Sequence, residues 1–224
     1  MSKFGVIGLG QFGTVIAKAL SSQGAEVMAI DNNEDHVENI KDDVAHAVTL
    51  DATDRKALEG QNVQELDAVV VAIGEDFEAL LMTTVQLMEM KVKRIVARAS
   101  TKQQRMILEK LGITEILSPE EEVGQTFAKM LINPNIKSFL ALPDGYEIVE
   151  IETPRKIIGK TIKDIDIRQK YGLNLITIKS KTEDQTSEYH IVGVPKAETK
   201  MNEKDILIIM GKHDEIEKFV QLNN

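Results

Sequence analysis

Three glycines near the start of the chain have the spacing of a phosphate-binding turn. Gly8, Gly10 and Gly13 form a G-x-G-x-x-G motif between the apolar run 4–7 and a helix-like stretch that begins at Phe12. In such a motif the first glycine permits a tight turn, and the second lets backbone N–H groups approach a pyrophosphate. The third lets the helix pack closely on the strand, and the helix N-terminus adds partial positive charge. The motif therefore predicts a site for nucleotide phosphates.

An aspartate at the end of the next apolar run completes this motif. Asp31 follows the run 26–30 and lies 18 residues after Gly13. A carboxylate there accepts hydrogen bonds from ribose hydroxyls and repels a 2′-phosphate. The combination predicts a site for an adenine nucleotide without a 2′-phosphate. The alternative is a glycine-rich turn in an ordinary α/β protein.

Further candidate residues follow later strand-like runs. Ligands of open α/β sheets bind beyond the carboxyl ends of the strands, so residues at those ends are expected at the same site. The residues after the third strand-like run are expected to contact adenine, and those after the fourth are expected to let the backbone close over the ligand. A cation at the end of the fifth run could reach the phosphates. An arginine paired with an acid such as Glu75 is the structural alternative for that cation. The residues are Asp51, Ala52 and Thr53, then Ile73 and Gly74, and finally Arg98.

Strands and helices must position these residues, and the sequence of the first half of the chain predicts such elements clearly. Apolar strand-like runs at 4–7, 26–30, 46–50, 68–73, 94–98 and 115–117 alternate with helix-like runs at 12–23, 34–42, 55–60, 78–90 and 102–111. This alternation predicts a Rossmann-like, doubly wound parallel sheet of six strands in an α/β domain.

The second half of the chain has a different pattern. Pro119 begins a helix that extends to about residue 132, and strand-like runs at 146–152, 173–179, 190–194 and 205–211 follow with short helices at 161–169 and 214–222. The polar segment 182–187 reads as a hairpin loop. We expect a nucleotide-binding domain over 1–118, a crossover helix and linker over 119–135, and a small α+β domain over 136–224.

Composition narrows the class of protein. The 224 residues are 42% hydrophobic and 28% charged, which is typical of a globular protein, and no apolar run is long enough to span a bilayer. The net charge of −9 and the aromatic content of 4% argue against a nucleic-acid-binding surface. The absence of cysteine excludes disulfides and thiolate metal sites. The first strand begins at once after Met1, so no signal peptide is expected, and we predict a cytoplasmic protein.

Residues for catalysis are harder to find than residues for binding. The four histidines are scattered, and His36 and His213 are expected on the surface. None of the three tyrosines is followed four residues later by lysine, and no G-x-S-x-G motif occurs. We therefore predict a binding protein rather than an enzyme, with an NAD-dependent oxidoreductase as the alternative.

Several segments together resemble the RCK (TrkA-N/TrkA-C) regulatory subunits of Trk and Ktr potassium-uptake systems. The resemblance covers nearly the whole chain, and three of its segments separate this family from dehydrogenases: Ala72-Ile73-Gly74-Glu75, Ser118-Pro119-Glu120 and Asp166-Ile167-Arg168-x-Lys170-Tyr171-Gly172. Membership implies a catalytically silent subunit that dimerises and assembles into an octameric ring. The ring would lie on the cytoplasmic face of a membrane potassium channel. Exchange of bound ATP for ADP, or of NADH for NAD, would change the shape of the ring.

The resemblance also assigns roles to individual residues. It places Gly8, Gly10, Phe12 and Gly13 at the phosphates, with Asp31 and Asn33 at the ribose. Asp51, Ala52 and Thr53 would contact adenine, Ile73 and Gly74 would cover the nucleotide, and Arg98 would lie near the phosphates. Glu120 matches a glutamate that helps to hold a sodium or divalent cation between the two nucleotides of a dimer. From the residues alone, Glu120 is equally an acid at a helix N-terminus.

This chain departs from the family pattern at one position, and a further resemblance concerns its second domain. Many Ktr-type members carry arginine where this chain has Gln11, and an amide cannot give a terminal phosphate the charge-assisted bonds of arginine. AMP, ADP and NAD(H) thereby become more plausible ligands relative to ATP. In the second domain, the segment 165–168, Asn174 and Pro195 resemble positions that bind cyclic di-AMP, although a helix packing into the core explains them as well.

Overall fold

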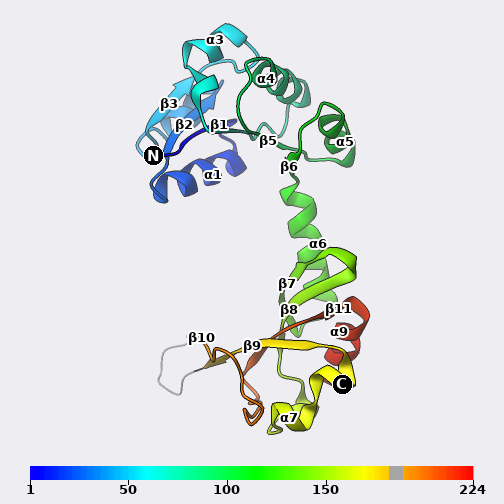
Figure 1. The fold of residues 1–224 in the computed structure, drawn as a ribbon. Coiled ribbons are helices and arrows are strands. Elements are labelled where there is room, and N and C mark those ends of the chain that lie inside the picture. Colours follow the sequence, from blue (N-terminus) through cyan, green and yellow to red (C-terminus); the bar gives the residue numbers. More distant parts are fainter. Residues whose placement is uncertain (182–188, 224) are drawn as a thin grey trace. The chain divides into compact units, whose positions relative to one another are not determined.

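A computed structural model describes residues 1–181 and 189–223 (Figure 1). The chain divides into two compact units, Met1–Glu121 and Glu122–Asn224, and the division falls inside helix α6, Pro119–Ile132. The predicted loop 182–187 lies outside the described residues.

The first unit is built on a six-stranded parallel sheet. Its strands are β1 (Lys3–Ile7), β2 (Glu26–Asp31), β3 (His46–Thr49), β4 (Ala68–Val71), β5 (Ile95–Arg98) and β6 (Glu115–Leu117), in the order β3-β2-β1-β4-β5-β6. Ile7 at the end of β1 pairs with Ile30 of β2 on one side and Val71 of β4 on the other. The predicted doubly wound fold is confirmed. The strand order reverses beside β1, so a ligand crevice is expected there.

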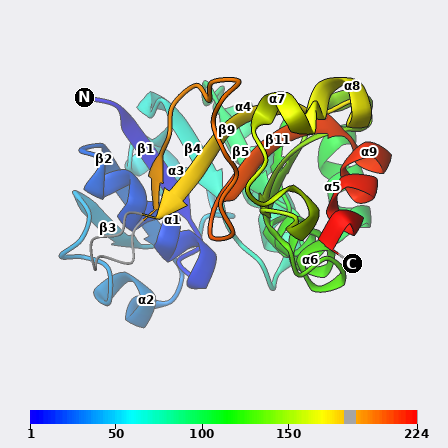
Figure 2. The same cartoon turned by 90° about the horizontal axis from the view of Figure 1, so that it is seen from below.

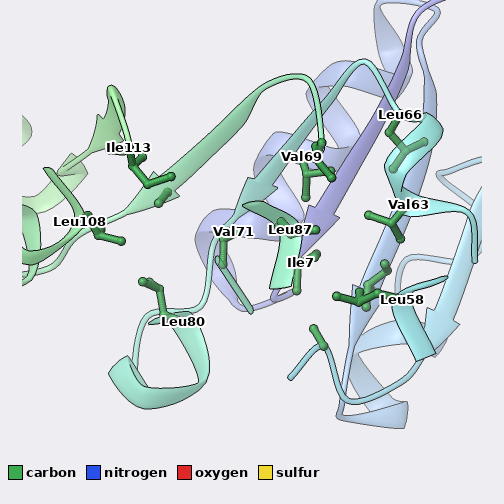
Figure 3. Packing of buried hydrophobic residues seen from close by; sticks show 14 of the residues in the cluster. Ile7, Leu58, Val63, Leu66, Val69, Val71, Leu80, Leu87, Leu108 and Ile113 are labelled. Carbon is green, nitrogen blue, oxygen red and sulfur yellow. The ribbon is translucent and has the colours of Figure 1, made fainter. Parts of the chain in front are cut away.

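Helices cover both faces of this sheet. They are α1 (Gln11–Ser22), α2 (Glu34–Glu38), α3 (Arg55–Gly60), α4 (Phe77–Glu89) and α5 (Lys102–Lys110). Residues of α1 and α2, including Ala17 and Val37, pack with Val6 and Val27 of the strands in one core cluster. Leu58 of α3, Leu80 and Leu87 of α4 and Leu108 of α5 belong to another cluster with Val69 and Val71 (Figure 3). Burial on both faces explains why β4 is apolar at every position.

Side-chain caps fix where several of these helices begin. Asn33, Asp54, Asp76 and Thr101 each accept a hydrogen bond from a backbone N–H in the first turn of α2, α3, α4 and α5, respectively. The predicted helix 34–42 was too long, because α2 ends at Glu38 and turns follow, in which the N–H of Ile40 bonds to Val37 O.

The second unit contains an antiparallel sheet of five strands. They are β7 (Ile136–Ala141), β8 (Tyr146–Glu152), β9 (Asn174–Lys181), β10 (Tyr189–Ile191) and β11 (Ile206–Lys212), in the order β10-β9-β11-β8-β7. The helices α7 (Ile162–Ile165), α8 (Ile167–Tyr171) and α9 (His213–Val220) complete the predicted α+β unit. Tyr171 of α8 and Phe219 of α9, helices that Figure 2 shows next to each other, pack edge to face at 5.0 Å.

The structure differs from the predictions for this unit at two places. No strand was predicted at β7, which lies at the edge of the sheet and has only Ile136 buried. The predicted helix 161–169 is two short helices, because Asp166 adopts a left-handed conformation with φ of 50° between α7 and α8.

Candidate nucleotide-binding site

The turn between β1 and α1 needs two of its three glycines for its own geometry. Gly8 has φ of +92°, and a Cβ atom there would lie 2.9 Å from the backbone nitrogen of Ile73. A Cβ on Gly13 would lie 1.8 Å from the carbonyl oxygen of Gly8. At Gly10, by contrast, no heavy atom of the described chain would lie within 4 Å of an added Cβ. The first and third glycines therefore serve the fold, and the second leaves open space in front of α1.

The N-terminus of α1 faces that space without a cap. None of the side chains in the described part of the chain caps the helix, and no acid occupies its first turn. Gly10, Gln11 and Phe12, which begin the helix, line a cavity. An uncapped N-terminus of a 12-residue helix is suited to bind an anion.

Asp31 is held rigidly at the end of β2. Its side chain accepts hydrogen bonds from the backbone N–H of Leu9 at 2.5 Å and of Asn33 at 2.8 Å, and the residue is 8% exposed. It nevertheless lines the cavity, so its carboxylate oxygens face both the turn and the ligand space. His36 lies beside it, with Nδ1 3.3 Å from Asp31 Oδ2. His36 is exposed, as predicted, and it also lines the cavity.

The cavity brings together most of the residues predicted from the sequence. It has a volume of about 1050 Å³ at the carboxyl ends of the parallel strands, which is ample for a nucleotide. Its predicted lining residues are Gly8, Gly10, Gln11, Phe12, Asp31, Asp51, Ala52, Thr53, Ile73, Gly74, Arg98 and Glu120. Gly13 and Asn33 lie outside this lining, because Gly13 packs against Gly8 and the side chain of Asn33 caps α2.

Asp51 is preorganised as a carboxylate by its neighbour. The hydroxyl of Thr53 donates to Asp51 Oδ1 at 2.7 Å, and the backbone N–H of Thr53 donates to the same oxygen at 2.9 Å. These two hydrogen bonds hold the pKa of Asp51 below its ordinary value. Asp51 therefore stays ionised at neutral pH and is available as an acceptor.

Arg98 lies at the end of the cavity that contains the α1 N-terminus. Its guanidinium carbon is 5.4 Å from the centre of the Phe12 ring, and it lies directly over Gly74, where any Cβ would collide with it. It forms an ion pair with Glu120 rather than with Glu75. Burial alone would raise the pKa of Glu120, but its own backbone N–H and the hydrogen bond and charge of Arg98 outweigh burial, so this pKa is lowered.

Polar atoms without partners concentrate at this cavity. Among residues 1–181 and 189–223, three buried side-chain polar atoms have no hydrogen-bond partner: Gln64 Oε1, Thr83 Oγ1 and Arg98 Nε. Thr83 and Arg98 both line the cavity. Both atoms are enclosed by the protein, so a ligand in the cavity would bond to them only after neighbouring groups move.

Several lining residues were missed by the sequence analysis. They include Val15, Asn32, His36, Asp76, Ala79 and Thr83. Val15, Ala79 and Thr83 project from α1 and α4, outside the strand ends where the candidates were sought. His36 could be recognised only as a residue of the helix that follows Asp31, the acid at the end of β2.

Acidic residues outnumber basic ones around the cavity. The lining includes Asp31, Asp51, Glu75, Asp76 and Glu120, whereas Arg98 is the one Lys or Arg in the described lining. Within the described ranges, no three His, Cys, Asp or Glu residues are grouped so as to hold a metal ion. A cation at Glu120 would therefore need further ligands, such as phosphate oxygens.

The pocket found in the second unit is far smaller than this cavity. A small apolar pocket of about 10 Å³ lies among Ile157, Ile162, Ile165, Ile167 and Leu207 and others, too small for a ligand. Arg168 donates a hydrogen bond to Asn174 Oδ1 at 2.7 Å, so two of the positions considered for cyclic di-AMP are paired with each other.

The fold defines a Rossmann-type domain joined to a small α+β module. Family models match both parts: the TrkA-N domain over residues 4–119 and the TrkA-C domain over residues 146–223. The chain belongs to the RCK (TrkA-N/TrkA-C) family of regulatory subunits of potassium-uptake systems, as the sequence analysis predicted.

Several known proteins similar to this chain are components of potassium-uptake systems. The "Ktr system potassium uptake protein C" of Bacillus subtilis is 36% identical over 217 residues, covering 97% of this chain and 95% of that protein. The crystal structure of the GsuK RCK domain matches with a TM-score of 0.67 at 16% identity, and the GsuK channel bound to NAD with 0.65 at 16%. This chain spans 48% and 39% of those two chains, and the likeness shows the shared fold. No helix among the described residues is long and apolar enough to cross a membrane.

Proposed function

We propose that this chain is a nucleotide-sensing regulatory subunit that gates a membrane potassium transporter from the cytoplasmic side. The observation that carries the proposal is the cavity in which Arg98 Nε lacks a partner beside the uncapped N-terminus of α1. An anion fits between these groups, and the open space at Gly10 lets it approach the backbone. The relationship to a Ktr potassium-uptake protein supplies the physiological context.

Each part of a nucleotide has a matching part of the cavity. The phosphates would lie at Gly8, Gly10, Gln11, Phe12 and Arg98. The ribose would lie at Asp31, which rejects a 2′-phosphate. The base would lie between Asp51 to Thr53 on one side and Ile73 and Gly74 on the other. NAD(H), ADP and AMP suit the cavity better than ATP does, because Gln11 adds no positive charge and acids dominate the lining.

The ion pair between Arg98 and Glu120 would couple the ligand to the rest of the molecule. Glu120 lies in the first turn of α6, so a phosphate that competes for Arg98 weakens a contact to that helix. A ligand that binds two conformations with different affinity shifts their populations, and this shift is what gating requires. The same glutamate, once released, would be free to help hold a sodium or divalent cation.

Assembly into a homodimer and an octameric ring is part of the proposal. Val123, Phe127 and Leu131 lie one helical turn apart on α6 and are 58–68% exposed, and Ile132 is 78% exposed. An apolar stripe of this kind is normally covered by another protein surface, and a second copy would cover it. Cyclic di-AMP at the second domain remains a further proposal on the resemblance of residues 165–168, Asn174 and Pro195.

Calorimetric titration with AMP, ADP, ATP, NAD, NADH and NADP tests the binding site. We expect at least one adenine nucleotide to bind, and NADP to bind at least about tenfold more weakly than NAD because Asp31 opposes its 2′-phosphate. Asp31→Asn should weaken NAD binding and narrow the gap to NADP. Asp67→Asn is the matched control, because Asp67 lies at the opposite ends of the strands and accepts the N–H of Lys3.

Two further measurements test the regulatory part. Potassium flux into vesicles that hold the membrane partner and this chain should change when the bound nucleotide is exchanged. Light scattering should find at least a dimer at micromolar concentration. Steady turnover of NADH by the purified chain would support the oxidoreductase alternative, and absence of binding by every nucleotide would refute the proposed site.

A further inference from the structure

His36 is the one histidine in the described lining of the cavity. It lies on α2, and its side chain is 43% exposed, so a ligand in the cavity can reach the ring. Its Nδ1 lies 3.3 Å from Oδ2 of Asp31, and the imidazole has no other polar partner among the described residues. Of the two ring nitrogens, Nε2 is therefore the one left for a ligand.

Asp31 alone has little capacity left for a ribose. A carboxylate offers about four lone-pair positions, two on each oxygen. On Asp31, Oδ2 accepts the backbone N–H of Leu9 and lies beside His36, and Oδ1 accepts the backbone N–H of Asn33. One position on Oδ1 remains, whereas a ribose carries two neighbouring hydroxyls. The second hydroxyl needs another partner, and the imidazole beside Asp31 can supply it.

The charged groups around His36 are acids. Helix α2 packs against β2 and β3. The acids of the helix and of these strand ends are Asp31 on β2, Asp51 just past β3, and Glu34, Asp35 and Glu38 on α2 itself. Glu38 is paired with Lys41, and in the described part of the chain no lysine or arginine lies within ion-pair distance of Asp31 or His36. His36 is therefore the described side chain beside Asp31 that can carry a positive charge.

The groups beside the acid at the end of β2 decide how a Rossmann-type site treats the 2′ position of the ribose. The acid binds a 2′-hydroxyl, whereas a cation near it accommodates a 2′-phosphate. A neutral imidazole that turns its Nδ1–H towards Asp31 can accept a hydrogen bond from a hydroxyl at Nε2. An imidazolium donates Nε2–H to a phosphate oxygen instead. Histidine changes between these two forms in the range from about pH 5 to 8, so one residue can serve both ligands.

We propose that His36 is a specificity-determining residue that contacts the ribose 2′ position, where it accepts a hydrogen bond from the 2′-hydroxyl when neutral and binds a 2′-phosphate when protonated. The inference rests on the proposed function, because it presumes that an adenine nucleotide occupies the cavity. It deepens that function: Asp31 alone would oppose a 2′-phosphate at neutral and mildly acidic pH alike, whereas Asp31 paired with a protonated His36 admits one in mildly acidic solution. The ligands that it adds are 2′-phosphorylated adenine nucleotides such as NADP.

Deoxynucleotides test the contact of the neutral form at pH 8. AMP and 3′-deoxy-AMP should each bind His36→Ala about fivefold more weakly than they bind the parent, the size of one neutral hydrogen bond. 2′-Deoxy-AMP should bind both proteins equally, because the group that His36 contacts is missing. His46→Ala, at an exposed histidine that begins β3 at the opposite end of the strands, is the matched control and should bind AMP as the parent does. An equal loss of affinity for AMP and 2′-deoxy-AMP in His36→Ala would overturn the contact.

Titration of NAD and NADP at pH 8 and pH 6 tests the protonated form. In the parent, the affinity for NADP relative to NAD should rise about tenfold on acidification, the size of one charge-assisted hydrogen bond. A phosphate monoester itself takes up a proton at about pH 6, so His36→Ala supplies the reference, and its ratio should change several-fold less. His36→Arg should bind NADP well at both pH values, because a guanidinium keeps its charge. The same pH dependence in the parent and in His36→Ala would overturn the inference.

Failure of this inference can be distinguished from failure of the proposed function. If NAD and AMP bind the parent but removal of His36 changes neither the comparison of deoxynucleotides nor the pH dependence, the inference alone fails. If no nucleotide binds the parent, the proposed function fails and the inference falls with it. The substituted side chain is exposed, so the ligand-free variants should melt close to the parent and the affinities compare folded proteins.

Discussion

The two units differ in whether each of their buried polar side chains finds a hydrogen-bond partner. In the second unit, Asp205 is 4% exposed and its oxygens accept hydrogen bonds from the Ser180 hydroxyl at 2.7 Å and from the backbone and side chain of Asn202 at 2.9 and 3.0 Å. In the first unit, Thr83 Oγ1 and Arg98 Nε are buried without partners. The comparison teaches that Asp205 is fully bonded within its own unit and serves the fold, whereas Thr83 and Arg98, which line the cavity, keep polar atoms that the described residues do not pair.

The largest expected effect concerns the glycines of the first unit. Gly13→Ala should lower the free energy of unfolding by about 4 kcal/mol or more, because its Cβ would meet the backbone oxygen of Gly8, which cannot turn aside. Gly10→Ala is the matched variant, with open space around the new methyl group. Urea titration should find Gly10→Ala nearly as stable as the parent, whereas calorimetry should find its nucleotide affinity reduced at least tenfold. Equal losses of stability would erase the distinction between a folding and a binding glycine.

A smaller loss of stability is expected from the paired acid of the second unit. Asp205→Ala should destabilise the protein by about 3 kcal/mol, because Ser180 and Asn202 lose their acceptor inside the fold. Nucleotide affinity should stay unchanged. Glu203→Ala, at an exposed position of the same turn, serves as the control. A drop in nucleotide affinity with Asp205→Ala would contradict a purely structural role for this acid.

A change in ligand preference should follow from adding charge to the cavity. Gln11→Arg should raise ATP affinity relative to AMP by about tenfold, since a guanidinium offers charge-assisted bonds to the extra phosphates. Gln23→Arg at the end of α1 adds the same net charge away from the cavity. The ratio of the two dissociation constants, measured at fixed ionic strength, decides the outcome. An equal gain in relative ATP affinity in both variants would mean that the overall charge of the protein, and not the position of the arginine, causes the change.

The smallest effect is a dependence on pH. The pKa of Glu120 is lowered in the folded protein from its ordinary value of 4.5, so its pairing with Arg98 stabilises the fold above pH 4.5 and is lost as the pH falls through the lowered pKa. Glu120→Gln should melt slightly below the parent at pH 7, and the difference should vanish in more acidic buffer. A difference that persists unchanged at pH 3 would mean that the charge of Glu120 is not what stabilises the pair.

What could be predicted from the sequence depended on whether the relevant interaction is local. Gly8, Gly10 and Asp31 were recognisable because a turn, a helix start and a strand end are encoded by neighbouring residues. Thr83 and His36 were not, because their places in the cavity follow from how α4 and α2 pack on the sheet. The break at Asp166 was missed since a left-handed aspartate inside an apolar periodic stretch looks like ordinary helix.

The cavity of the first unit has a consequence for the lifetime of the protein in a cell. A ligand that binds the folded form alone stabilises it in proportion to the logarithm of ligand concentration over dissociation constant. Proteases degrade the opened chain, so the fraction that opens sets the rate of turnover when opening is rapid. Because nucleotide would bind the folded form through the cavity, copies without nucleotide should be degraded faster, and pulse-chase measurements under nucleotide depletion would reveal a metabolically controlled abundance.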